Sequence, residues 1–164
     1  PSAVTPVAGI RDFTITDATG EVIVAASSMW VVLDLKRMRP VPVARHMPAY
    51  KLVSEKALEP DFTKLEPLCH IDNTRVFDVH VDEIDLYNHV NNAVYPSWIL
   101  DAFESDFLKE HDLSEIKILF KHPAVYTDKI VMETQIDEKE TRHIIRSDTN
   151  EKVFADIKAV WRNG

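Results

Sequence analysis

Several patterns that mark membrane and secreted proteins are missing from this 164-residue sequence. There is no run of about 18 apolar residues that could span a bilayer, and the N-terminus lacks the charged-then-apolar order of a secretory signal. Cys69 is the only cysteine, which excludes an internal disulfide and a structural zinc site built on cysteines. We therefore expect no membrane span and a reducing compartment, the cytoplasm. The chain begins at Pro1 without an initiator methionine, so we expect a processed or truncated product.

Positive charge is also scarce. The chain has 19 Lys and Arg against 27 Asp and Glu, a formal net charge of -8. Because contacts to phosphates need clustered positive charge, we exclude a general nucleic-acid binder. No HExxH-like pair of histidines indicates a metal site, and we expect no metal and no cofactor. One basic cluster is either a solvated strand end and linker or a docking site for an acidic partner; it consists of Lys36, Arg37, Arg39 and Arg45.

The composition suits a globular protein with a packed core, because 45% of the residues are hydrophobic. Residues 11–35 contain short β-rich runs around a turn at 18–21, where Gly20 can adopt a positive φ, and they predict a hairpin. Five of the nine prolines fall within residues 40–72, which we interpret as a linker.

After the linker, "NTRVFDVHV" predicts a strand, and "NNAVYPSWILDAFESDFLKEH" changes to helical spacing. Asn92 can cap this helix, and Pro96 suits its first turn. Tyr95 and Trp98 are either packing residues or also part of a pocket wall. The predicted buried face consists of Tyr95, Trp98, Ile99, Ala102, Phe103 and Phe107. Four further strands are predicted at residues 116–120, 129–136, 141–146 and 152–161. This order predicts an α+β fold in which an antiparallel sheet wraps around a long central helix.

A faint internal repeat relates the two predicted hairpins. Residues 14–30 can be laid on residues 144–160 at a constant offset, matching Thr19 with Thr149 and Glu21 with Glu151. Either two hairpins share turn chemistry by chance, or the chain holds one complete strand-helix-meander unit and the last strands of another.

The segment "DLYNHVNN", residues 85–92, crowds polar groups against the start of the predicted helix. Near a thioester carbonyl, Asp85 could activate water or attack directly, and His89 could orient the water or hold the carbonyl. N–H groups from Val90 to Asn92 could then stabilise the oxyanion. The alternative is structural, because an aspartate in a turn commonly accepts hydrogen bonds from its own turn.

"DLYNHVNNAVYPSWILD" resembles the signature "D-x-x-x-HVNN-x-x-Y-x-x-W-x-x-(D/E)" of hotdog-fold thioesterases. The similarity is strongest to the acyl-acyl carrier protein thioesterases, which contain two hotdog domains in tandem. "IRDFTITDATGEVIVAASSMWVVLDLKRMRP" is similar to the last strands of that family's first hotdog. The resemblance implies C-terminal strands of an incomplete first hotdog at 1–40, a Pro-rich linker at 41–70 and a second hotdog domain at 71–164.

The resemblance implies an enzyme, a thioester hydrolase that releases free fatty acid from acyl carrier protein in fatty acid biosynthesis. It assigns Asp85 and His89 as the catalytic pair. Additional substrate or oxyanion contacts would come from Tyr87, Asn88, Asn91 and Asn92. The sequence departs from the family at Tyr87, where an asparagine is usual, and at Pro123 and Ala124, where a glutamate often occurs with a cysteine after it in plant members.

Two alternatives stay open on the sequence. The run from Phe120 to Asp128 resembles acyl-CoA thioesterases related to 4-hydroxybenzoyl-CoA thioesterase, and the chain could also be a non-catalytic acyl-binding hotdog module. In each case we expect a homo-oligomer, because the hairpin at residues 11–35 would leave open strand edges.

Overall fold

A computed structural model describes residues 1–37, 39–46 and 51–164. The chain divides into two compact units, Pro1–Thr63 and Lys64–Gly164. Within the predicted linker, α1 (Val43–His46) is a single helical turn, residues 47–50 lie outside the described part, and residues 51–70 form neither helix nor strand. Among the described residues, none of the helices has both the length and the apolarity needed to cross a membrane.

The first unit is a small antiparallel sheet in the order β1 (Ala3–Val4), β2 (Ala8–Thr16), β3 (Val22–Val31). The short strands β4 (Leu33–Asp34) and β5 (Arg39–Pro40) pair separately. The predicted hairpin is confirmed as β2 and β3. Its turn is closed by the Asp17 carboxylate, which accepts hydrogen bonds from the N–H groups of Thr19 and Glu21 at 2.8 and 2.9 Å. Gly20 has a φ of 90°, a conformation that glycine adopts without steric cost.

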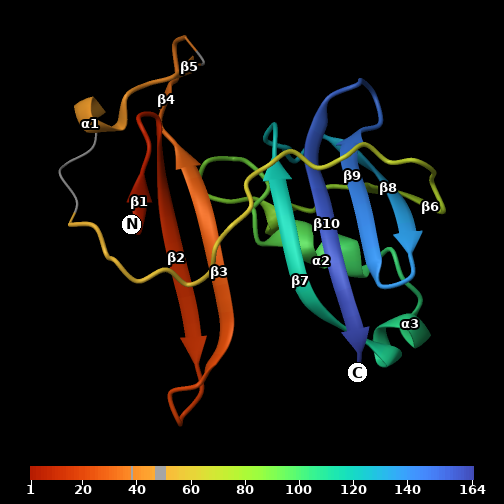
Figure 1. Ribbon diagram of the computed structural model, residues 1–164. Helices are drawn as coiled ribbons and strands as arrows, with labels where there is room; N and C mark the ends of the chain where they lie inside the picture. Colours follow the sequence, from red (N-terminus) through yellow and green to blue (C-terminus); the bar gives the residue numbers. More distant parts are fainter. Residues whose placement is uncertain (38, 47–50) are drawn as a thin grey trace. The chain divides into compact units, whose positions relative to one another are not determined.

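The second unit is a five-stranded antiparallel sheet with α2 (Val94–Leu100) against one face (Figure 1). The strand order is β6 (Asn73–Asp78), β8 (Lys129–Asp137), β9 (Glu140–Ser147), β10 (Val153–Asn163) and β7 (His111–Phe120). The 3₁₀ turn η1 (Val81–Glu83) lies between β6 and α2, and α3 (Ser105–Glu110) leads into β7.

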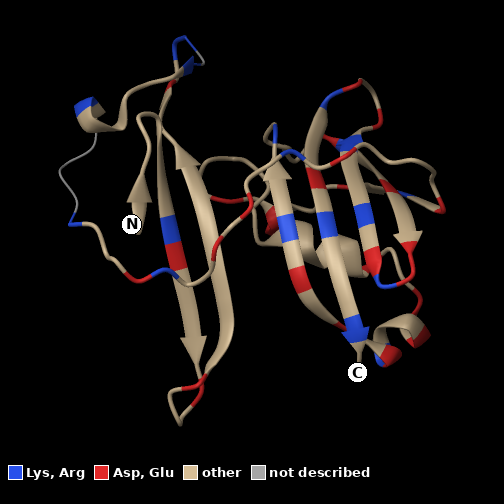
Figure 2. Cartoon of the chain, viewed as in Figure 1, with Lys and Arg blue, Asp and Glu red and all other residues tan. Residues whose placement is uncertain are grey.

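The core lies between α2 and the sheet. Tyr95, Trp98 and Ile99 of α2 are 1 to 3% exposed. They pack in one cluster with apolar side chains of the strands, which include Ile130, Met132, Ile145, Phe154 and Ile157. Strand residues alternate across a sheet, so the opposite face carries charges of both signs along β7, β9 and β10 (Figure 2). Partly exposed ion pairs join Arg146 of β9 to Glu133 of β8 and Lys158 of β10 to Glu140 of β9, each at 2.6 Å.

The prediction of one long helix is wrong, because the helical segment is interrupted after seven residues. Ala102 N–H bonds to Ile99 O, and Phe103 N–H to Leu100 O, a tightened turn that ends α2. Glu104 is extended, and α3 restarts at Ser105, a residue type that favours helix starts over interiors. The helical spacing of apolar residues in the sequence continues through the break, so the spacing alone does not reveal it. Phe103 and Phe107 both remain edge-on to Trp161, with ring centroids 5.1 and 5.2 Å away.

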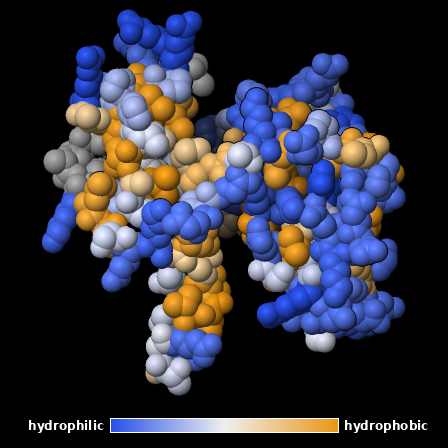
Figure 3. All heavy atoms as spheres, viewed as in Figure 1, coloured by the Kyte–Doolittle hydropathy of each residue, from blue (hydrophilic) through white to orange (hydrophobic). Residues whose placement is uncertain are grey.

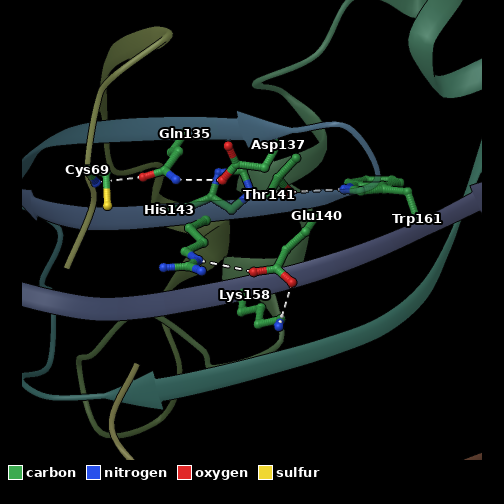
Figure 4. A network of polar contacts seen from close by, with 9 residues as sticks. Cys69, Gln135, Asp137, Glu140, Thr141, His143, Lys158 and Trp161 are labelled. Atoms are coloured by element: carbon green, nitrogen blue, oxygen red, sulfur yellow. Dashed lines mark hydrogen bonds and ion pairs between the residues drawn. The ribbon is translucent and has the colours of Figure 1, made fainter. Parts of the chain in front are cut away.

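A buried histidine lies in the core on β9 (Figure 4). His143 is 1% exposed, and its Nδ1 and Nε2 atoms each lie 3.0 Å from a hydroxyl oxygen, of Thr134 and Thr141 respectively. The indole N–H of Trp161 donates to the same Thr141 oxygen at 3.0 Å. Burial lowers the pKa of His143 to about 3, because the protonated ring would lose its hydration. The ring is therefore neutral over the physiological pH range.

We predict an acid-sensitive fold from this histidine. Its pKa is about 3 in the folded chain against an ordinary value of 6.5, so between these values the unfolded chain binds a proton that the folded chain does not. The contribution of His143 to the free energy of unfolding is fully present above pH 6.5. It decreases by up to about 1.4 kcal/mol for each pH unit as the pH falls from 6.5 toward 3. Urea unfolding at pH 7.5 and 5 should show a smaller pH effect for His143→Gln than for wild type. Equal losses in both proteins would contradict the prediction.

Candidate active site

The polar segment between η1 and α2 forms a tight turn, residues 84–90, which we call the 84–90 turn. At its base, the N–H of Asn91 donates to the carbonyl oxygen of Glu83 at 2.8 Å. Ile84 and Val90 then form an antiparallel bridge. The N–H of Asp85 donates to the carbonyl oxygen of His89 at 2.8 Å. These bonds make the two sides of the turn a short ladder, and they bring the predicted pair, Asp85 and His89, to opposite positions.

The Asp85 carboxylate closes this turn. Its Oδ1 atom accepts hydrogen bonds from the N–H groups of Tyr87 at 2.8 Å and His89 at 3.2 Å. Asn88 supplies the left-handed residue that so tight a reversal requires, with a φ of 60°, a conformation that asparagine tolerates better than most residues. The structural role considered for Asp85 is therefore present in the fold. Only Oδ1 serves it, because no described residue donates a hydrogen bond to Oδ2.

The tip of the 84–90 turn points outward. Tyr87 is 80% exposed, so its ring does not enter the core, and Asn88 and His89 are exposed as well. The turn therefore forms with Tyr87 at the position where the resemblance implies an asparagine, and the phenol of Tyr87 is exposed to solvent.

The helix start differs from the prediction. α2 begins at Val94, its N-cap residue is Ala93, and no described side chain caps the helix. Asn91, three residues before the helix, accepts hydrogen bonds from the two N–H groups at its start. The side-chain oxygen of Asn91 accepts from the N–H of Ala93 at 3.0 Å, and its carbonyl oxygen accepts from Val94 at 2.9 Å. The prediction that Asn92 caps the helix is wrong because α2 begins two residues after Asn92 and Ala93 occupies the N-cap position. Pro96 does lie in the first turn, as predicted.

The expected oxyanion donors are largely occupied. The N–H of Val90 donates to the carbonyl oxygen of Ala124, and that of Asn91 to Glu83, both at 2.8 Å. These two groups cannot also stabilise an oxyanion while the fold holds them. Of the three positions predicted, the N–H of Asn92 is the one with no acceptor in the described part of the chain.

The segment with the second departure lies beside the turn. Ala124, fully buried, accepts the Val90 N–H, and its backbone also hydrogen-bonds the hydroxyl of Tyr95. Burial raises the pKa of Tyr95 to about 12, so the phenol stays protonated. Pro123 and Ala124 bring no carboxylate to this place. Nor, among the residues that the structure describes, do three or more His, Cys, Asp or Glu side chains gather as a metal site would need.

Comparison with known proteins identifies the family to which this turn and sheet belong. The family model for the acyl-ACP thioesterase C-terminal domain matches residues 67–163, which include the 84–90 turn, α2 and all five strands of the larger sheet. The chain belongs to this family.

Relatives within the family include plant proteins. The acyl-[acyl-carrier-protein] hydrolase FATB2, chloroplastic, of Cuphea viscosissima is 25% identical over 166 residues, covering 93% of this chain and 40% of that protein. The palmitoyl-acyl carrier protein thioesterase, chloroplastic, of Cuphea hookeriana is 29% identical, covering 68% of this chain and 29% of that protein. The chain thus spans two fifths or less of the length of these relatives.

Solved structures show the same fold. The 12:0-ACP thioesterase from Umbellularia californica has a TM-score of 0.81 at 16% identity, covering 99% of this chain and 64% of that one. An acyl-ACP thioesterase from Bacteroides thetaiotaomicron has a TM-score of 0.77 at 18% identity, covering 98% and 65%. The predicted α+β hotdog fold is confirmed, whereas the assignment of residues 1–40 to an incomplete first hotdog stays a prediction.

The corrected helix start leads to a stability prediction. Asn91→Ala should lower the free energy of unfolding by about 1 kcal/mol, because it removes the side-chain acceptor of the Ala93 N–H in the turn that leads into α2. Asn92→Ala, the matched control one residue along, should change it by less than about 0.5 kcal/mol. Urea titrations followed by circular dichroism measure both. A larger loss for Asn92→Ala would restore the capping role to that residue.

Proposed function

We propose that this chain carries the catalytic turn of a thioesterase that hydrolyses fatty acyl-acyl carrier protein and releases free fatty acid. The observation that carries the proposal is the 84–90 turn, which brings Asp85 and His89 to opposite positions within the segment matched by the acyl-ACP thioesterase family. The names of the plant relatives, acyl-[acyl-carrier-protein] hydrolase and palmitoyl-acyl carrier protein thioesterase, support the substrate class.

In the proposed reaction, water adds to the thioester carbonyl carbon, and the carbon–sulfur bond then breaks. Asp85 takes the proton from water through Oδ2, because Oδ1 is held by the turn. His89, exposed beside it, orients the water or the carbonyl. The proton passes to the leaving sulfur, so the products are a fatty acid and the carrier's thiol.

Hydrogen bonds to the developing oxyanion would come from groups that the fold leaves available. These are the N–H of Asn92 and the side-chain amides of Asn88, Asn91 and Asn92, with the Tyr87 hydroxyl as a further donor. The Val90 and Asn91 N–H groups have no part in it, since they are bonded to backbone carbonyls.

The decisive variant is Asp85→Asn. An asparagine keeps the side-chain oxygen that accepts from Tyr87 and His89, so the turn and the thermal midpoint should stay close to wild type. It cannot take up a proton, so turnover of acyl-acyl carrier protein should fall roughly 100- to 10,000-fold. Steady-state kinetics and thermal unfolding of the same preparation measure both quantities.

A matched variant shows whether this result is specific to Asp85. Asp82→Asn makes the same chemical change on the exposed side of η1 and should keep wild-type activity.

A comparison of two substrates tests the substrate class. Acyl-CoA of the same chain length should react more slowly and without the salt dependence of the carrier-protein substrate, because salt screens docking of an acidic carrier. Faster hydrolysis of acyl-CoA, or acyl binding without hydrolysis at any chain length, would contradict the proposed function.

We also propose that the chain associates into a homo-oligomer. Large apolar side chains stay exposed on the β2–β3 hairpin (Figure 3), among them Ile15 at 56%, Ile23 at 61% and Trp30 at 51%. β3 is also an outer strand of its three-stranded sheet. Apolar strands at a sheet edge favour pairing with another chain. Light scattering coupled to size exclusion should give a mass of at least two chains, and a monomer with an intact sheet would contradict this.

The cytoplasmic location expected from the sequence stays a prediction of its own, since the plant relatives are named chloroplastic. Expression with a fluorescent tag in the source cell, against organelle markers, tests it directly. Enrichment in an organelle would contradict it.

A further inference from the structure

Glu83 is a carboxylate at the base of the 84–90 turn that the proposed reaction does not use. Its Oε1 atom accepts a hydrogen bond from the indole N–H of Trp98 at 2.7 Å. Its Oε2 atom accepts from the backbone N–H of His80 at 2.8 Å, which closes the capping box of η1. Both carboxylate oxygens therefore have a donor within 2.8 Å.

The backbone of the same residue holds the turn. The Glu83 carbonyl oxygen accepts from the Asn91 N–H at 2.8 Å, and the next residue, Ile84, forms the bridge with Val90. Glu83 is thus bonded to His80 just before η1, to Asn91 at the base of the turn and to Trp98 of α2. Bonds to ionised groups are the stronger class of protein hydrogen bond, and the bond to Trp98 links residues 15 apart in sequence.

Trp98 is a rigid anchor for this link. Its side chain is 3% exposed, and its ring lies against Phe77 of β6 and Tyr95 of α2, with centroid distances of 5.1 and 4.9 Å. The turn itself is exposed at its tip, where Leu86 is 99% accessible. The Glu83 to Trp98 bond therefore connects a solvent-exposed turn to the packed core.

We propose that Glu83 is a positioning residue, which fixes the 84–90 turn against α2 and so places Asp85 and His89 for the reaction. This inference rests on the proposed function. Glu83 acts through Trp98 and the turn and does not itself exchange protons with substrate, since its two oxygens are engaged by N–H donors. Misplacement of a catalytic group by about 1 Å can cost roughly 100-fold in rate.

Kinetics of Glu83→Ala, Trp98→Phe and the double variant test the link. Trp98→Phe keeps a ring in the core and removes the indole donor. Each single variant should lower kcat roughly 10- to 100-fold with KM within about threefold. The double variant should be no worse than Glu83→Ala, because the two residues act as one unit. Glu83→Gln, which keeps one acceptor oxygen for Trp98, should recover part of the loss, and Asp82→Asn should behave as wild type.

The pH profile separates positioning from catalysis. If Glu83 only positions the turn, kcat/KM in Glu83→Gln keeps the pH limbs of wild type at a lower plateau. Loss or displacement of a limb would overturn the inference and make Glu83 an acid or base. Additive losses in the double variant would overturn it as well.

Amide hydrogen exchange provides a readout that needs no activity. Glu83→Ala and Trp98→Phe should raise exchange at the Asp85 and Asn91 N–H groups about tenfold or more and leave the amides of β8 and β9 unchanged. If wild type hydrolyses no acyl-acyl carrier protein, the proposed function fails while this measurement still tests the link. Unchanged exchange at the turn, or faster exchange throughout the sheet, overturns the positioning role.

Discussion

Burial of the aromatic face of α2 against the five-stranded sheet is the contact on which the rest of this structure depends. Tyr95 and Trp98 are nearly inaccessible, and they meet strand side chains that are also fully buried. Large aromatic rings remove more apolar surface from water than any other side chains, so this contact dominates the hydrophobic stabilisation of the unit. It also holds Trp98 in place, and the base of the 84–90 turn is bonded to this residue through Glu83.

The candidate site next to this contact is held together by hydrogen bonds within the 84–90 turn and between Glu83 and Trp98. The Asp85 carboxylate organises the turn with one oxygen, Oδ1, and the proposed reaction uses the other. Glu83 connects the base of the turn to Trp98, so one indole ring serves both packing and positioning. Asp85 and Glu83 each accept backbone N–H groups of the turn or of the segment before it, as side chains commonly do where no helix or strand pairs the backbone donors.

Polar groups inside the core follow a different rule. His143 is neutral and flanked by two threonine hydroxyls, whereas the cations of the opposite sheet face remain partly exposed in ion pairs. The difference reflects the cost of burying charge: a neutral imidazole with two hydrogen-bonding partners can lie in the core, and a guanidinium or ammonium group stays near water. Alternation of side chains along β9 is what puts His143 and Arg142 on opposite faces.

Local sequence determined the features that depend on neighbouring residues. These are the β2–β3 hairpin with Gly20 in its turn, the turn that Asp85 and His89 close, the apolar face of α2, and the family signature from Asp85 to Asp101. The sequence pattern missed the break after α2 and the N-cap at Ala93, because the apolar spacing and the asparagines extend across these positions. Only the tertiary structure decided that Val90 donates its N–H to the carbonyl of Ala124 and that Glu83 accepts from Trp98. The reason is physical. Turn chemistry and periodicity act over a few residues, whereas these two bonds join residues at least 15 apart in sequence, which meet only in the folded chain.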